Sequence, residues 1–128
     1  MLSTKILIID DEPDVNTYLE AVLKSNGYET YSISNVESAM DRVREIHPQL
    51  ICLDIMMPRE TGISFYSKLR KDKDFCKTPV IIISGVVESD KFNIYSFVSD
   101  KSIPAPECYM EKPINVEKFI KKVKQLTN

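Results

Sequence analysis

Short runs of apolar, largely β-branched residues recur along the chain and constrain its fold more than any other feature of the sequence. Three of them are "KILIID" (Lys5–Asp10), "LICLDI" (Leu50–Ile55) and "PVIIIS" (Pro79–Ser84). An apolar run of this length is typical of a central strand that is covered on both faces. Two further runs, Glu29–Ile33 and Cys108–Glu111, are interpreted as additional strands. The sequence therefore predicts five short strands.

Between these strands the apolar residues recur with the period of a helix. From Val15 to Leu23 they fall at i, i+3, i+4, i+7 and i+8, and Gly27 follows as a helix stop. The segment Ser34–Glu37 has capping-box spacing, so a second helix is expected to begin there and to continue to Ile46. Three more helices are expected over residues 63–69, 89–98 and 116–123, the last opened by Asn115.

The regular alternation of strands and helices predicts an α/β fold, a doubly wound parallel sheet with helices on both faces. In such a sheet, ligands bind at the carboxyl ends of the strands, beside the point where the strand order reverses. The candidate site residues are therefore the polar residues at strand ends. They are Asp10, Asp11, Asp54, Ser84 and Lys112.

Length, charge and cysteine usage narrow the class of protein. A chain of 128 residues forms one domain, with a core over about residues 4–126, and its net charge of -2 argues against direct binding to nucleic acid. Cys52, Cys76 and Cys108 have no metal-ligand spacing and are expected to be free thiols. No secretory signal and no apolar run near the roughly 18 residues of a membrane span is present, so a cytoplasmic location is predicted.

The residues at the strand ends suggest a chemistry. Three carboxylates at one sheet edge repel each other, and a hard cation bound by oxygen atoms relieves that repulsion. Mg²⁺ (or Mn²⁺) is expected, because it takes one or two carboxylates together with phosphate oxygens. Lys112 supplies a charge and Ser84 a hydroxyl, and both suit the oxygens of a phosphoryl group. The set indicates phosphoryl transfer to an aspartate.

Four motifs, "ILIIDDEPD", "LICLDIMMPRETG", "VIIISG" and "YMEKPI", carry a resemblance to a known family. In this order and spacing they resemble the receiver domain of two-component response regulators, in particular the single-domain chemotaxis regulators. The resemblance covers essentially the whole chain and implies a flavodoxin-like sheet of strand order 2-1-3-4-5. It implies a phosphorylation-activated switch in which Asp54 accepts a phosphoryl group from a histidine kinase or a histidine phosphotransfer protein.

The resemblance also implies roles at the metal and at the switch. Asp11 would bind Mg²⁺ directly, Asp10 largely through water and Met56 through its backbone carbonyl, beside Asp54. Ser84 and Lys112 would contact the phosphoryl oxygens, with Gly85 as the small residue at the rim.

Ser84 and Tyr109 would respond to phosphorylation, and the Lys112–Pro113 peptide bond is expected to be cis, a state that proline makes accessible. Tyr109 is equally well explained as a packing aromatic.

Two apolar residues are expected at the rim of the site, Met56 two positions after Asp54 and Val86 two positions after Ser84. Neither side chain can orient an attacking water, so we predict slow self-dephosphorylation, because hydrolysis needs a positioned nucleophile. The domain would thus catalyse its own phosphorylation and slow dephosphorylation without being a conventional enzyme.

The chain departs from the family pattern between Ser84 and Lys112. This region is longer than usual, and the unusual segment Ser89–Pro106 combines an aromatic-rich fourth helix with a proline-containing loop. The family's usual output face is therefore expected to be remodelled, so the output partner and the mode of dimerisation do not carry over from the resemblance. The chain is expected to be a monomer or a weak dimer. The chain ends at Asn128, directly after the last expected helix, so no output domain is expected in it.

Simpler interpretations compete at several positions. Asp10 and Asp11 on their own would be read as caps of the first helix. His47 is expected to be structural at a helix end. The lysines of the last helix are expected to be its solvated face, and Cys52 a core residue.

Three other functions compete with the phosphorylation switch. An Asp-dependent small-molecule phosphatase usually has an acid two residues after a first-strand nucleophile, and Glu12 stands there, but no cap segment is present. A nucleotide- or flavin-binding module lacks a glycine-rich first turn. A receiver-like interaction module regulated by protein contacts is the third alternative.

Overall fold

The computed structural model describes residues 3–55, 62–85 and 102–128. Its elements are β1 (Lys5–Ile9), α1 (Pro13–Ser25), β2 (Glu29–Ile33), α2 (Ala39–Ile46), β3 (Leu50–Asp54), α3 (Gly62–Lys71), β4 (Val80–Ser84), β5 (Cys108–Glu111) and α4 (Val116–Thr127). The five strands form one parallel sheet in the order β2-β1-β3-β4-β5. This confirms the expected fold class and strand order.

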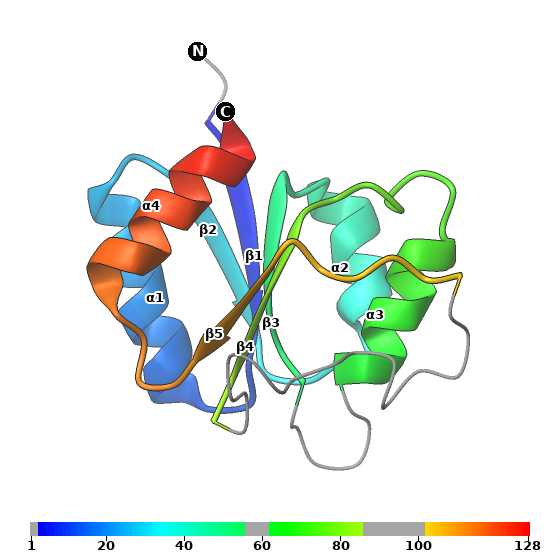
Figure 1. Cartoon of the computed structure of the whole chain (residues 1–128), viewed down its shortest axis with the longest axis horizontal. Coiled ribbons are helices and arrows are strands. Elements are labelled where there is room, and N and C mark those ends of the chain that lie inside the picture. The colour runs from blue at the N-terminus through cyan, green and yellow to red at the C-terminus, as the bar shows by residue number, and fades with distance from the viewer. Residues whose placement is uncertain (1–2, 56–61, 86–101) are drawn as a thin grey trace.

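Helices cover both faces of the sheet, with α1 and α4 on one side and α2 and α3 on the other (Figure 1). The alternation of side chains along each strand explains this arrangement. In β1, Ile6 and Ile8 pack in the layer with α1 and α4, whereas Leu7 and Ile9 pack in the layer with α2 and α3. Every residue of β3 and β4 is buried. The central strands are therefore held between two apolar layers.

The register of the strands brings the candidate residues to one edge. Ile9 of β1 pairs with Leu53 of β3, so Asp10 and Asp54 follow at the same level. Asp54 pairs with Ile83 of β4, which places Ser84 one residue further along. Ser84 in turn pairs with the last residue of β5, and Lys112 comes next. Four residues that are far apart in the sequence thus lie at or directly after the ends of their strands, within two residue positions of each other along the sheet.

The second helix begins later than its capping-box pattern predicts. α2 starts at Ala39, with Ser38 as the capping residue, so the expected start near Ser34 is wrong. The side-chain oxygen of Asn35 accepts hydrogen bonds from the backbone N–H and the hydroxyl of Ser38, both at 3.4 Å. Asn35 therefore holds a turn where the box predicts helix, a competition that Asn side chains commonly win.

At the other end of the chain, the predicted cap is confirmed. The side chain of Asn115 accepts a hydrogen bond from the N–H of Lys118 at 3.0 Å and opens α4. The fourth helix expected over residues 89–98 lies outside the described residues.

A buried arginine ties α3 to the segment that precedes β5. Arg70 Nε donates to the Tyr66 hydroxyl at 3.0 Å, and one Nη donates to the Thr78 carbonyl at 2.6 Å. The other Nη pairs with Glu107 Oε1 at 2.9 Å, and that oxygen also accepts the N–H of Val80 at 2.8 Å. The Arg70 side chain is only 2% exposed, so these partners compensate a buried charge. The network holds the amino ends of β4 and β5, whereas the candidate residues lie at the carboxyl ends of the strands.

Several residues take the structural roles expected of them. His47 ends α2 in the left-handed region at φ 54, and its N–H donates to the Val43 carbonyl at 2.9 Å. Cys52 is buried in the core, and it, Cys76 and Cys108 are free thiols. Within the three described ranges, none of the helices combines the length and the apolar character that crossing a membrane requires.

Candidate functional site

Lys112 and two buried aspartates form the centre of the site. Asp10 directly follows β1, Asp54 ends β3 and Lys112 directly follows β5. Lys112 Nζ lies 2.9 Å from Asp10 Oδ2 and 3.4 Å from Asp54 Oδ2. The side chains of both aspartates are 3% exposed, so the lysine compensates two carboxylates that are almost removed from water.

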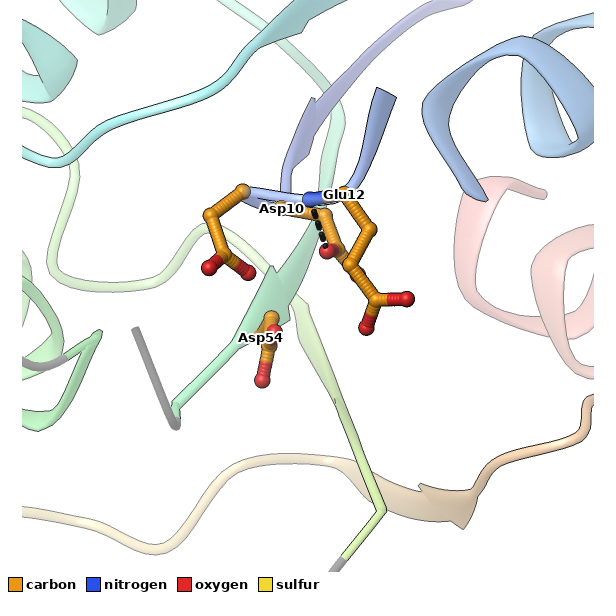
Figure 2. A group of neighbouring side chains, drawn as sticks. Asp10, Glu12 and Asp54 are labelled. Atoms are coloured by element: carbon orange, nitrogen blue, oxygen red, sulfur yellow. Dashed lines mark hydrogen bonds between the residues drawn. The ribbon is translucent and has the colours of Figure 1, made fainter. Parts of the chain in front are cut away.

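Glu12 extends this centre toward solvent. Its Oε1 lies 2.9 Å from Lys112 Nζ, and its side chain is 60% exposed. The backbone N–H of Glu12 donates to Asp10 Oδ1 at 2.9 Å, the hydrogen bond that Figure 2 draws as a dashed line. Figure 2 also shows Asp10 and Glu12 on the loop after β1, with Asp54 beside them at the end of β3. Sequence reasoning missed Glu12 as a member of the site, although the run of three acids in "IDDEP" was a signal.

The carboxylates form an acidic cluster, which consists of Asp10, Asp11, Glu12 and Asp54. One oxygen from each residue can be chosen so that all four lie within 4.8 Å of one another. Asp10 and Asp54 are buried, whereas Asp11 is half-buried and Glu12 exposed. An all-oxygen set of this charge fits a hard divalent cation such as Mg²⁺, and a partly open edge leaves room for water or phosphate oxygens as further ligands. The residues present therefore fit the metal that the sequence predicts.

The charge of Lys112 is fixed by its surroundings. Burial on its own disfavours the ammonium form, but hydrogen bonds to Glu12 and Asp10 and the charges of Asp54 and Asp10 outweigh that effect. The pKa of Lys112 is consequently raised above its ordinary value. Lys112 therefore stays protonated throughout the neutral pH range and presents a permanent positive charge at the end of β5.

The other candidate residues surround this centre. Ser84 is completely buried, and its carbonyl accepts the N–H of Lys112 at 3.1 Å, which joins the ends of β4 and β5. The Lys112–Pro113 peptide bond is cis. Gly85 is exposed next to Ser84, and Tyr109 is half-buried against the core layer of α2 and α3. Tyr109 thus packs against the core, and its response to phosphorylation stays a prediction.

The structure does not describe the two predicted rim residues, and one glycine that the sequence did not predict lies against the site. Met56 and Val86, the expected rim residues, lie outside the described residues. Gly62 was not singled out, yet a Cβ at this position would meet the Asp54 carbonyl oxygen at 2.3 Å. The backbone that carries Asp54 thus passes directly against the start of α3.

Comparisons with known proteins agree with this geometry. The model of the response regulator receiver domain matches residues 6–124. The polar-differentiation response regulator DivK of Brucella ovis is 30% identical over 123 residues, which cover 94% of each chain. The probable transcriptional regulator ycf27 of Porphyridium aerugineum is 31% identical over 124 residues, or 96% of this chain and 50% of the relative. The chain thus spans about half the length of this regulator.

Solved structures show the same fold. The response regulator TrrA of Thermotoga maritima, crystallised in complex with Mg²⁺-BeF, is 30% identical and has a TM-score of 0.76, with 96% of this chain and 98% of TrrA covered. The chemotaxis protein CheY4 of Vibrio cholerae is 22% identical with a TM-score of 0.84, covering 98% of this chain and 99% of CheY4, a likeness of fold alone. By the match of the family model and by its relatives, this chain belongs to the response regulator receiver domain family.

Proposed function

We propose that this chain is a phosphorylation-activated signalling switch in which Asp54 accepts a phosphoryl group from a phosphohistidine of a histidine kinase or phosphotransfer protein. The observation that supports this most directly is that Asp54, a buried member of the acidic cluster, lies beside a protonated lysine at the carboxyl edge of the sheet. Phosphorylation-dependent signalling is typical of the family to which the chain belongs.

The proposed reaction is a displacement at phosphorus. An Oδ atom of Asp54 forms a bond to phosphorus while the phosphorus–nitrogen bond of the donor breaks, and the leaving imidazole takes up a proton. The product is an acyl phosphate on Asp54. Because such transfers involve little bond-making before the transition state, catalysis consists mainly of positioning and charge neutralisation.

Each residue of the chain has a defined task in this proposal. Asp10 and Asp11 would hold Mg²⁺ together with Asp54, and the metal would supply positive charge for the transferring oxygens. Lys112 would donate a hydrogen bond to a phosphoryl oxygen, because its Nζ already lies 3.4 Å from Asp54 Oδ2. The Ser84 hydroxyl would donate to another, since the register places Ser84 on the neighbouring strand one residue further along than Asp54. The Mg²⁺-BeF complex of the relative TrrA supports the choice of metal.

The experiment is incubation with acetyl phosphate and Mg²⁺, followed by intact mass spectrometry. We expect the mass of one phosphoryl group on the protein, none on Asp54→Asn, and the full amount on Asp41→Asn, an exposed aspartate of α2 that serves as a matched control. Borohydride converts an acyl phosphate to the alcohol, so peptide mapping then locates the modified residue. Absence of an adduct on the parent protein would contradict the proposal and favour an interaction module regulated by protein contacts.

The lifetime of the phosphoryl group is a separate part of the proposal. Because Met56 and Val86 carry no group that can orient water, we expect slow decay of the phosphorylated protein. Met56→Asn or Val86→Glu should accelerate the decay, measured as loss of the adduct mass after the donor is removed. An unchanged decay rate in both variants contradicts this part and leaves the assignment of Asp54 intact.

A further inference from the structure

Glu12 shares the ammonium group of Lys112 with the two buried aspartates. Nζ lies 2.9 Å from Glu12 Oε1, 2.9 Å from Asp10 Oδ2 and 3.4 Å from Asp54 Oδ2. A lysine ammonium group has three donors. With three acceptors around it, the two shorter contacts go to Glu12 and Asp10, and the longest goes to the proposed phosphoryl acceptor.

The backbone of Glu12 is held firmly, although its side chain is exposed. Its N–H donates to Asp10 Oδ1, and its carbonyl accepts the N–H groups of Val15 at 3.1 Å and Asn16 at 3.2 Å. It is also the residue that caps α1, directly before Pro13, and its own side chain makes no capping bond. The Glu12 side chain therefore starts from a fixed backbone position, and its exposed carboxylate contacts Lys112 instead of capping the helix.

We propose that Glu12 is a positioning residue that competes with the phosphoryl oxygen for Lys112 and so opposes formation of the acyl phosphate on Asp54. This inference rests on the proposed function. All three donors of Lys112 already have an acceptor, so a phosphoryl oxygen on Asp54 has to compete for one of them, and the contact to the exposed Glu12 is as short as that to Asp10. Removing Glu12 leaves that donor available, so both a phosphoryl group and a mimic of it should bind more tightly.

The test is titration of the protein with beryllofluoride in the presence of Mg²⁺, followed by fluorine NMR, together with the rate of phosphorylation by acetyl phosphate. Glu12→Gln keeps the shape of the side chain and removes its charge. Since a partly exposed ion pair contributes little, we expect affinity and rate to rise about three-fold. Asp14→Asn, the same change of charge at an exposed position of the first turn of α1, is the matched control and should stay near the parent value.

A double-mutant cycle separates competition from simple repulsion of anions at the entrance. In a Lys112→Ala background the gain from Glu12→Gln should vanish, because the shared group is gone. A gain that persists there overturns the proposal. Where binding by Lys112→Ala is too weak to titrate, Glu12→Asp decides: it keeps the charge but is shorter by one methylene group. The beryllofluoride affinity of Glu12→Asp should rise toward that of Glu12→Gln, and an affinity equal to that of the parent overturns the proposal.

The outcomes also distinguish this inference from the function on which it rests. A parent protein that binds beryllofluoride and gains a phosphoryl group, with Glu12→Gln unchanged in both assays, overturns the role of Glu12 alone. A parent protein that does neither overturns the proposed function, and the role of Glu12 with it.

Discussion

Replacing Gly62 with alanine should destabilise the protein, although the same change in an ordinary helix has the opposite effect. Gly62 is the first residue of α3, and it is buried. A Cβ there would lie 2.3 Å from the Asp54 carbonyl oxygen, 2.9 Å from Ile55 Cα and 3.1 Å from the Asp54 carbonyl carbon. All three atoms belong to the backbone, which cannot rotate away as a flexible side chain would. The added methyl group must therefore push α3 and the end of β3 apart.

The expected magnitude follows from two opposing effects. Alanine in place of glycine stabilises a helix by about 0.5–1 kcal/mol. Forcing an extra carbon into a filled space costs about 1–3 kcal/mol. We expect a net loss of about 1–2 kcal/mol in the free energy of unfolding, which lowers the melting temperature by about 3–8 °C in a domain of this size. Because the displaced atoms belong to Asp54, the proposed acceptor, phosphorylation should also slow by about ten-fold or more.

Urea unfolding at equilibrium, followed by circular dichroism, measures the loss of stability. Ser67→Ala in the same helix is the control, since its side chain is only partly buried and a serine-to-alanine change should alter the free energy of unfolding by no more than about 0.5 kcal/mol. If Gly62→Ala is as stable as the parent or more stable, the close approach of the two segments does not constrain the protein and the reasoning fails.

Three further predictions concern groups away from the proposed acceptor. Arg70→Ala should lower the free energy of unfolding by about 3 kcal/mol, because a buried pair loses one partner, whereas the exposed Arg44→Ala should cost about 1 kcal/mol or less in the same urea titration. The pKa of Asp72 is lowered from 3.8, first by the backbone N–H of residue 74 and also by Arg44. The Asp72 carboxylate therefore contributes to the free energy of unfolding above pH 3.8, and this contribution is lost as the pH falls from 3.8 through the lowered pKa. The difference in free energy of unfolding between the parent and Asp72→Asn should shrink over the same pH range, as urea titrations at several pH values would measure. Burial raises the pKa of the Cys52 thiol, and iodoacetamide should alkylate the partly exposed Cys76 long before it; equal rates in peptide mapping would contradict the packing of β3.

The fold could be predicted because both faces of the sheet impose the same requirement on the strands. Apolar residues on both sides of a central strand produce an unbroken run, as in β3 and β4. The expected ranges Glu29–Ile33 and Cys108–Glu111 have the same bounds as β2 and β5. The runs in β1, β3 and β4 differ from expectation by one residue at an end. The edge of the sheet at which the site forms follows from parallel topology alone.

What the sequence could not predict depends on contacts between segments that are distant along the chain. The start of α2 was misplaced, because a capping-box spacing does not reveal that Asn35 bonds to Ser38 first. Glu12 belongs to the site only because Lys112, 100 residues later in the chain, follows β5 and contacts the loop after β1. The need for glycine at position 62 arises from the path of the Asp54 backbone. None of these contacts leaves a periodic signal in the sequence.

Asp54 and Lys112, two of the three charged residues at the centre of the site, lie on parts of the sheet that differ in burial. Asp54 ends β3, whose five residues are all buried, whereas Lys112 follows β5, an edge strand whose first three residues are half-buried and whose last is exposed. Local opening requires less free energy where fewer apolar contacts must be broken. When a phosphoryl group changes the balance of charge between the two residues, β3 is therefore expected to stay in place, and the adjustment falls on Lys112 and the end of β5. Phosphorylation of the central strand would then change the conformation of the edge strand β5, which also contains Tyr109.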